Sequence, residues 1–187
     1  MNNIPTYKFA LREDLQHSDY RKFLPLRAEP KATGWDVRAA MPNRKLLRIK
    51  PFQQVKIPLG FRGFCPEDWW YELKPRSSTF GKKSLHALYG TIDETYEGEL
   101  VFACQYIPEV NYETCSLDGI DWLEPIEWSY YCRKNELCIE FGEAIGQIIP
   151  TRREEMNTIE ISNGEYNRLS QERDAVRKAG GFGSTGK

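Results

Sequence analysis

Residues 46–73 read LLRIKPFQQVKIPLGFRGFCPEDWWYEL. This stretch is rich in Ile, Val, Phe and Trp, and Pro or Gly interrupts it every few residues without a sustained 3.6-residue hydrophobic period. The pattern predicts short strands joined by turns. GELVFACQY at 98–106 and ELCIEFGEAIGQIIP at 136–150 repeat it, as alternating or fully apolar runs bounded by Gly and Pro. The sequence therefore predicts an all-β sandwich or barrel.

The two ends of the chain differ from this central part. The first 25 residues are polar and irregular, which predicts an extension lying on the body of the domain. NGEYNRLSQERDAV at 163–176 is the best helix signal and could form a short polar turn of helix, but its apolar stripe is weak and we interpret it as a mobile connector. The glycine-rich end, AGGFGSTGK, cannot bury much surface and predicts an arm. We place the extension at 1–23, the barrel at 24–160, and the connector and arm at 161–187.

Composition excludes several classes of protein. The chain has 187 residues, enough for one domain with a core, and 26 Lys and Arg against 27 Asp and Glu. No general basic field exists, so we expect no direct nucleic-acid binding. No apolar run approaches the roughly 18 residues of a membrane helix, and the start lacks the pattern of a secretory signal. We expect a cytoplasmic protein, in the host cytoplasm if the source is viral.

The cysteines agree with a reducing cytosol. The chain has 5 of them, without a C-x-x-C pair or a His-rich metal spacing, so buried reduced thiols are the favoured interpretation. They are Cys65, Cys104, Cys115, Cys132 and Cys138.

Asp36 and Gln147 are lone polar side chains in apolar, strand-like segments. In ATGWDVRAA at 32–40, Gly34 allows a tight backbone and Asp36 projects a carboxylate, which is costly to bury unless it is paired or near a cation. In GEAIGQIIP at 142–150, Gln147 interrupts an apolar run. A buried amide needs partners, so Gln147 is either a satisfied core residue or a ligand contact.

KPRSST at 74–79 combines a turn with hydrogen-bond donors. The proline sets the turn, Arg76 offers a planar fork of donors, and Ser77 and Ser78 add hydroxyls and backbone N–H groups. This is the chemistry of an oxyanion pocket, and it is also the composition of an ordinary surface turn.

YGTIDETYEGEL at 89–100 lies between two strand-like runs. Asp93 and Tyr96 are three residues apart in it, so a carboxylate and an aromatic ring can face one cavity. The alternative is a hairpin in which Asp93 caps its own turn.

The order of these segments is more specific than any one of them. A-x-G-x-D, P-R-S-S, G-x-I-D-x-x-Y-x-G-E, G-x-x-I-x-Q and R-x-x-G-G-F-G-S-T-G follow one another in a β protein of fewer than 200 residues. From about residue 24 to 187 the chain closely resembles the trimeric dUTP pyrophosphatases (dUTPases). The resemblance implies a jelly-roll-like β barrel and a homotrimer with active sites at subunit boundaries.

The resemblance also implies a reaction. dUTP would be hydrolysed to dUMP and pyrophosphate, which keeps uracil out of DNA and supplies dUMP for thymidylate synthesis. Asp93 would orient and activate the water that attacks the α-phosphorus, and Tyr96 would pack on the deoxyribose and exclude a 2′-hydroxyl. Mg²⁺ would be held mainly by the three phosphates, and Asp36 would touch it through water.

The other contacts with dUTP follow from the same motifs. Arg76, Ser77 and the N–H of Ser78 would hold the phosphates together with Gln147, and the hairpin into Gly90 would read uracil through its main chain. The C-terminal arm would close over the nucleotide; a truncated P-loop would need a strand before it and a helix after it. The full set of implied substrate-binding residues is Arg76, Ser77, Ser78, Gly90, Ile92, Tyr96, Gln147, Arg177, Phe182, Gly183, Ser184 and Thr185.

Three features depart from the family pattern. Ala144 stands where an arginine is usual, and Lys178 where a glycine is common. About 25 extra residues, at 106–134, separate the third and fourth motifs and form an acidic, aromatic insertion. The insertion either packs on the barrel itself, or its Trp122 and Trp128 anchor a protein partner or extend the trimer. Some phage members of the family resemble this layout, with an insertion at a similar place that can serve protein partners.

Two other functions compete with dUTP hydrolysis. A dCTP deaminase shares the barrel and an R-S-S segment, but it needs a catalytic glutamate in the strand after the third motif, where ELVFACQY is apolar apart from Glu99, Cys104 and Gln105. A dUTP-binding regulatory protein would act on a partner through the insertion. Asp93, Tyr96 and Arg177 argue against a catalytically idle sensor.

Overall fold

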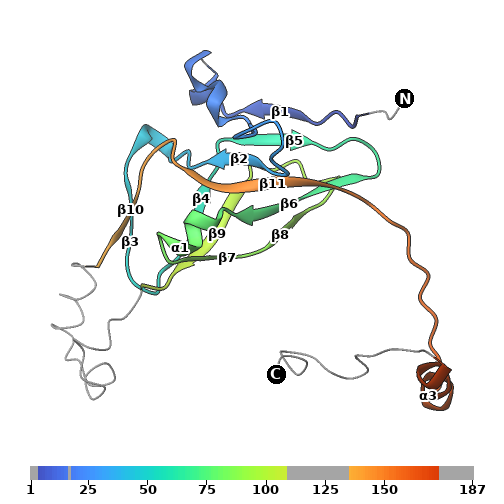
Figure 1. The fold of residues 1–187 in the computed structure, drawn as a ribbon. Coiled ribbons are helices and arrows are strands. Elements are labelled where there is room, and N and C mark those ends of the chain that lie inside the picture. The colour runs from blue at the N-terminus through green and yellow to red at the C-terminus, as the bar shows by residue number, and fades with distance from the viewer. Residues whose placement is uncertain (1–3, 17, 109–134, 173–187) are drawn as a thin grey trace, which may run out of the picture. The chain divides into compact units, whose positions relative to one another are not determined.

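The computed structural model describes residues 4–16, 18–108 and 135–172. The chain divides into two compact units, Met1–Arg153 and Glu154–Lys187. The first unit is built from short strands, so the predicted all-β class is confirmed (Figure 1). Its strands are β1 (Lys8–Leu11), β2 (Trp35–Arg38), β3 (Leu47–Ile49), β4 (Gln54–Pro58), β5 (Phe61–Phe64), β6 (Trp69–Pro75), β7 (Leu85–Ala87), β8 (Gly90–Ile92), β9 (Val101–Tyr106), β10 (Leu137–Ile139) and β11 (Ala144–Arg152).

The strands form antiparallel sheets with the orders β2-β11-β6-β8, β4-β9-β7, β1-β5 and β10-β3. Short helices lie between them: η1 (Glu13–Leu15), η2 (Ser18–Phe23), η3 (Pro42–Arg44) and α1 (Ser77–Gly81). β11 is central in its sheet, because it pairs with β2 on one side and with β6 on the other. This arrangement brings the ends of β2, β6 and β11 together.

Alternation along β6 separates a core face from a polar face. Tyr71 and Leu73 are buried, whereas Glu72 and Lys74 between and beyond them are half-buried. The same alternation in the other strands gives one main core. Its buried members include Val37, Ile49, Ile57, Leu59, Phe61, Tyr71, Leu73, Leu85, Phe102, Ile139, Ile145 and Ile148.

The N-terminal segment is more regular than its polar sequence predicts. β1 pairs with β5, and the alternating side chains of Tyr7, Phe9 and Leu11 pack against the main core. Leu15 and Phe23 are fully buried in a second cluster. The described part of this segment lies on the body of the domain, as predicted, but the expectation that it is irregular is wrong, because a period-2 apolar pattern lies among its charged residues. The domain boundaries after residues 23 and 160 stay predictions.

The second unit contains a helix in the stretch that we interpret from the sequence as a connector, with a short turn of helix as the alternative. α3 (Asn163–Glu172) is exposed along its length, and its N–H at Glu165 donates to the hydroxyl of Ser162 at 3.1 Å. Ser162 and Glu165 have the S-x-x-E spacing of a helix-capping box, which is the sequence signal for this helix. The rest of the expected connector, and the arm, lie outside the described residues.

None of the helices formed by the described residues is long and apolar enough to cross a lipid bilayer. The thiols of Cys65, Cys104 and Cys138 are free.

Burial disfavours the charged forms of two thiols and two phenols, which predicts a loss of stability at alkaline pH. Burial raises the pKa of Cys65 and of Cys104 from 9.0 to about 11, and it raises the pKa of Tyr7 and of Tyr71 above 10.0. Such groups contribute stability that is fully present below the unfolded pKa values of 9.0 and 10.0 and is lost as pH rises toward the folded values. We expect the Tm, followed by circular dichroism, to fall progressively above about pH 9.

Tyr71→Phe is the matched variant. The Tyr71 hydroxyl is buried and has no hydrogen-bond partner among the described residues, so its removal should leave stability at pH 7 within about 1 kcal/mol of the parent or improve it. The variant should also lose less Tm between pH 9 and pH 11. An unchanged Tm over this range in the parent protein would contradict the prediction.

Candidate active site

Three of the predicted motifs meet at one end of the β2-β11-β6-β8 sheet. Asp36 on β2 lies directly opposite Gln147 on β11, and Arg76 follows the end of β6. The Nε of Arg76 lies 3.2 Å from Oδ1 of Asp36. The Asp36 side chain is 16% exposed, so its burial is offset by the guanidinium, which is the cation that a lone carboxylate in an apolar strand requires.

Gly34 makes room for the Gln147 amide. A Cβ at position 34 would collide with the Gln147 side chain where it now lies, so a larger residue would displace the amide. The first and fourth motifs are thus packed directly against each other.

The PRSS segment forms the short helix α1 and not only a turn. Arg76 is its N-cap residue, and Ser77 and Ser78 are in its first turn, where backbone N–H groups have no partner within the helix. Thr79 fixes the helix to β11, because its buried hydroxyl donates to the carbonyl of Ile145 at 2.6 Å. Thr79 was not among the predicted site residues, and its role depends on a contact with a residue that is distant in sequence.

The third motif lies at the other edge of the same sheet. Gly90 and Ile92 are on β8, and Asp93 follows it and is exposed. The N–H of Tyr96 donates to the carbonyl of Asp93 at 3.1 Å, so both residues belong to one tight turn. A pocket of about 350 Å³ lies here, lined by Trp69, Trp70, Thr91, Asp93, Glu94, Thr95 and Arg153.

The Asp36–Arg76 pair and the turn that carries Asp93 are far apart along the sheet. β8 pairs with β6 so that Ile92 lies opposite Tyr71, and Asp93 and Trp70 line the same pocket. Trp70 and Arg76 are six residues apart. Because a strand rises about 3.3 Å per residue, the Asp93 and Arg76 backbones are separated by roughly 20 Å. A single chain therefore does not bring Asp93 to Arg76.

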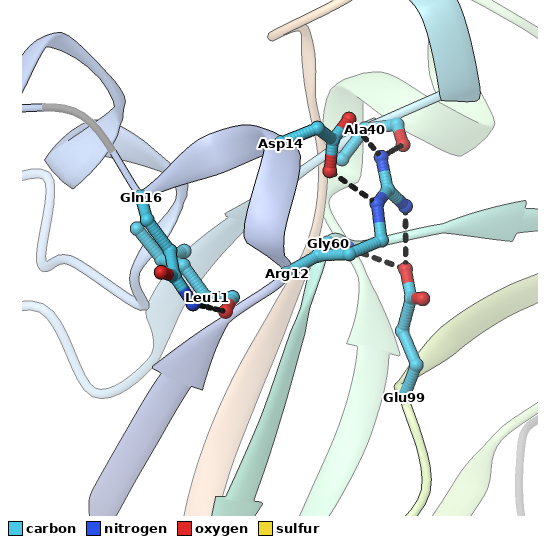
Figure 2. Close-up of polar contacts among 7 residues, drawn as sticks. All are labelled: Leu11, Arg12, Asp14, Gln16, Ala40, Gly60 and Glu99. Atoms are coloured by element: carbon cyan, nitrogen blue, oxygen red, sulfur yellow. Dashed lines mark hydrogen bonds and ion pairs between the residues drawn. The ribbon is translucent and has the colours of Figure 1, made fainter.

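Arg12 and Glu99 are part of a network that the sequence analysis did not predict (Figure 2). Nη1 of Arg12 lies 2.8 Å from Oε1 of Glu99, and the N–H of Gly60 donates to the same oxygen at 3.0 Å. Arg12 also binds both carboxylate oxygens of Asp14, at 2.7 and 3.1 Å. The network ties the N-terminal segment to the end of the third motif.

Several predicted residues lie outside the described residues. They are Arg177, Phe182, Gly183, Ser184 and Thr185 of the arm, together with the insertion from 109 to 134. Within the described part of the chain, no group of three or more His, Cys, Asp and Glu side chains is arranged to hold a metal ion.

No family model matches the chain. The deoxyuridine 5′-triphosphate nucleotidohydrolase of Aquifex aeolicus is 44% identical over 79 residues, which span 41% of this chain and about half (51%) of that protein. The nucleotidohydrolase of the same name from Rhizobium rhizogenes is 28% identical over 165 residues, which span 87% of this chain and 85% of that protein. The chain is thus similar to dUTPases over most of its length.

Solved dUTPase structures have the same fold. A mutant of the phage 80alpha dUTPase superposes with a TM-score of 0.64 at 22% identity, over 98% of this chain and 99% of the phage protein. The dUTPase of Streptococcus mutans superposes with a TM-score of 0.58 at 19% identity, over 80% of this chain and 98% of that one. The predicted jelly-roll β barrel is thus confirmed. The predicted enzyme class, dUTP diphosphatase, is the one named for the relatives of this chain.

Proposed function

We propose that the chain hydrolyses dUTP to dUMP and pyrophosphate with Mg²⁺, as a homotrimer. The observation that carries this proposal is the meeting of Asp36, Arg76 and Gln147 at one end of the sheet in a chain that also presents Asp93 and Tyr96 on an exposed turn. The reaction removes dUTP, keeps uracil out of DNA and supplies dUMP for thymidylate synthesis.

The phosphates bind at the Arg76 end. Because Arg76 contacts Asp36 through Nε, its terminal amino groups are directed to an incoming anion and can hold two phosphate oxygens at once. The N–H groups of Ser77 and Ser78 in the first turn of α1 supply further donors. Gln147 adds its amide from the neighbouring strand.

Asp93 is the general base of the chemical step. Its carboxylate accepts a proton from a water molecule as the water oxygen forms a bond to the α-phosphorus. The bond from that phosphorus to the oxygen that bridges the α- and β-phosphates breaks, and pyrophosphate leaves with the electron pair. Tyr96 packs on the deoxyribose and leaves no room for a 2′-hydroxyl, while main-chain groups from Gly90 to Ile92 read the uracil ring.

The donor set fits a magnesium ion that the substrate itself carries. Asp36 is a single carboxylate already paired with Arg76, which suits a contact through water and not a dedicated cage of carboxylates. When bound, Mg²⁺ neutralises charge on the triphosphate. One related phage structure, the dUTPase of phage phi11, is described with a structural Mg(II) ion.

The separation of about 20 Å between Asp93 and Arg76 supports assembly. An active site that uses both residues must take them from different subunits, which a cyclic oligomer allows by repeating one contact around its axis. The arm, with Arg177, Phe182, Gly183, Ser184 and Thr185, would close over the bound nucleotide. The protein partner of the 106–134 insertion stays a prediction.

A panel of nucleotides tests the proposed reaction. The protein is incubated with Mg²⁺ and dUTP, dCTP, dTTP or UTP, and both pyrophosphate and ammonia are followed. Rapid release of pyrophosphate from dUTP alone is expected. Ammonia from dCTP would indicate a deaminase, and the absence of both products would indicate a binding protein; either result would contradict the proposal.

A further inference from the structure

The turn from Asp93 to Glu99 carries both the proposed base and the proposed sugar-packing ring, yet it contains neither helix nor strand. Asp93 and Tyr96 are exposed. An exposed turn of this kind has few buried apolar contacts to hold it. Its geometry must therefore depend on polar contacts from the neighbouring elements.

Arg12 holds one end of this turn. Its Nη1 lies 2.8 Å from Oε1 of Glu99, which also accepts the N–H of Gly60 at 3.0 Å. The main chain of Arg12 is fixed to the same place, because its N–H donates to the carbonyl of Gly60 at 2.8 Å. Glu99 is thus bound both to Arg12, the residue that follows β1, and to Gly60 in the turn between β4 and β5 (Figure 2).

The guanidinium of Arg12 is itself tightly oriented. Nε and Nη2 contact the two oxygens of Asp14, and Nη2 also donates to the carbonyl of Ala40 at 2.8 Å. The hydrogen bond to Asp14 raises the pKa of Arg12, and the same contact lowers the pKa of Asp14. Because Asp14 holds one side of the planar Arg12 guanidinium, the remaining amino group, Nη1, is directed at Glu99.

Glu99 in turn fixes Tyr96. The hydroxyl of Tyr96 donates to the main-chain carbonyl of Glu99 at 3.1 Å. The ring lies close to Gly98, since a Cβ at position 98 would be 2.5 Å from the Tyr96 hydroxyl oxygen. The position of the ring therefore follows the main chain at 98 and 99, which the Glu99 side chain anchors to Arg12.

The Asp93 end of the turn has a separate anchor. Oε2 of Glu94 lies 3.1 Å from Nη1 of Arg153 and accepts the N–H of Asp68 at 3.2 Å. Loss of Arg12 therefore leaves the support of Asp93 in place.

We propose that Arg12 is a positioning residue for Tyr96, and that through Glu99 it sets the discrimination between 2′-deoxyribonucleotides and ribonucleotides. This inference rests on the proposed function. The Tyr96 ring can exclude the 2′-hydroxyl of a ribonucleotide only if the ring is held in place. Weakening the Arg12–Glu99 contact should therefore let UTP bind before it slows the attack on dUTP. The expected signature is a change in selectivity without an equal loss of kcat.

Two variants and one control test this role. Arg12→Gln and Glu99→Gln each remove one charge from the contact and so weaken it. Each should raise the ratio of kcat/KM for UTP to kcat/KM for dUTP by about tenfold, with kcat for dUTP kept within about threefold. The double variant should be no more than slightly worse than the stronger single variant, because both changes remove one interaction. Arg48→Gln is the control, since Arg48 pairs with Glu136 away from this turn and should leave the ratio unchanged.

Unchanged selectivity in both single variants would overturn the proposal, as would a loss of kcat equal for both nucleotides. If Arg12→Gln does not fold, Glu99→Gln decides alone, because its amide oxygen still accepts the N–H of Gly60. Hydrogen exchange of residues 94–100 gives a readout independent of activity: it should be faster in either single variant than in Arg48→Gln. A parent protein inactive on dUTP would reject the proposed function, and unchanged exchange would reject the anchor itself.

Discussion

Asp93→Asn is expected to lower the turnover of dUTP by about 10²–10⁴-fold while leaving its affinity for dUTP nearly unchanged. Asparagine has the size and shape of aspartate but cannot accept the proton of the attacking water. Asp93 is exposed, so the substitution should cost little stability. The phosphate contacts near Arg76 are distant on the same chain and should persist.

The measurement is a comparison of kcat, KM and the Kd for a dUTP analogue with a non-hydrolysable bridge between the α- and β-phosphates. Glu97→Gln is the matched control, because Glu97 is an exposed carboxylate in the same turn. It should retain full turnover. Turnover by Asp93→Asn within about threefold of the parent would show that Asp93 is not the base.

Local pattern was enough to predict the class of fold. The stretch at 46–73 contains β3, β4, β5 and most of β6, and the other two apolar stretches contain β9, β10 and most of β11. Turn residues and β-branched or aromatic side chains act over a few neighbours, so they are visible in the sequence. The same is true of the capping pair Ser162 and Glu165, whose helix was nevertheless interpreted as a connector.

Contacts between distant residues could not be predicted from pattern. The pairing of Asp36 with Arg76 depends on the position of β11 between β2 and β6. The role of Arg12 depends on a partner 87 residues away. Neither the Asp36–Arg76 pair nor the Arg12–Glu99 pair has a recognisable pattern in the sequence. The charged residues near Arg12 also make the apolar alternation of β1 difficult to recognise.

The site is also incomplete in one chain for a physical reason. A strand is rigid and extended, so residues near its two ends cannot meet. Asp93 lines a pocket with Trp70 at the start of β6, whereas Arg76 follows the end of β6. The two residues are therefore far apart although their motifs are neighbours in the sequence. We propose that a second copy of the chain brings these residues together.

Two inactive variants are expected to restore activity when they assemble together. Arg76→Gln removes the planar fork for the phosphates and leaves Asp36 without its cation, so alone it should lose about 10²-fold or more in kcat/KM. Asp93→Asn alone lacks the base. In a mixed trimer, one boundary can combine the intact Arg76 of one subunit with the intact Asp93 of its neighbour.

The central claim is that Arg76 and Asp93 of one active site come from different subunits. Its most direct test is the specific activity of Asp93→Asn and Arg76→Gln subunits co-expressed with different affinity tags and purified through both tags in turn. Every mixed trimer has one intact boundary among its three, so purified mixed trimers should recover about a third of the parent activity. Mixed trimers no more active than the two variants alone would contradict the claim.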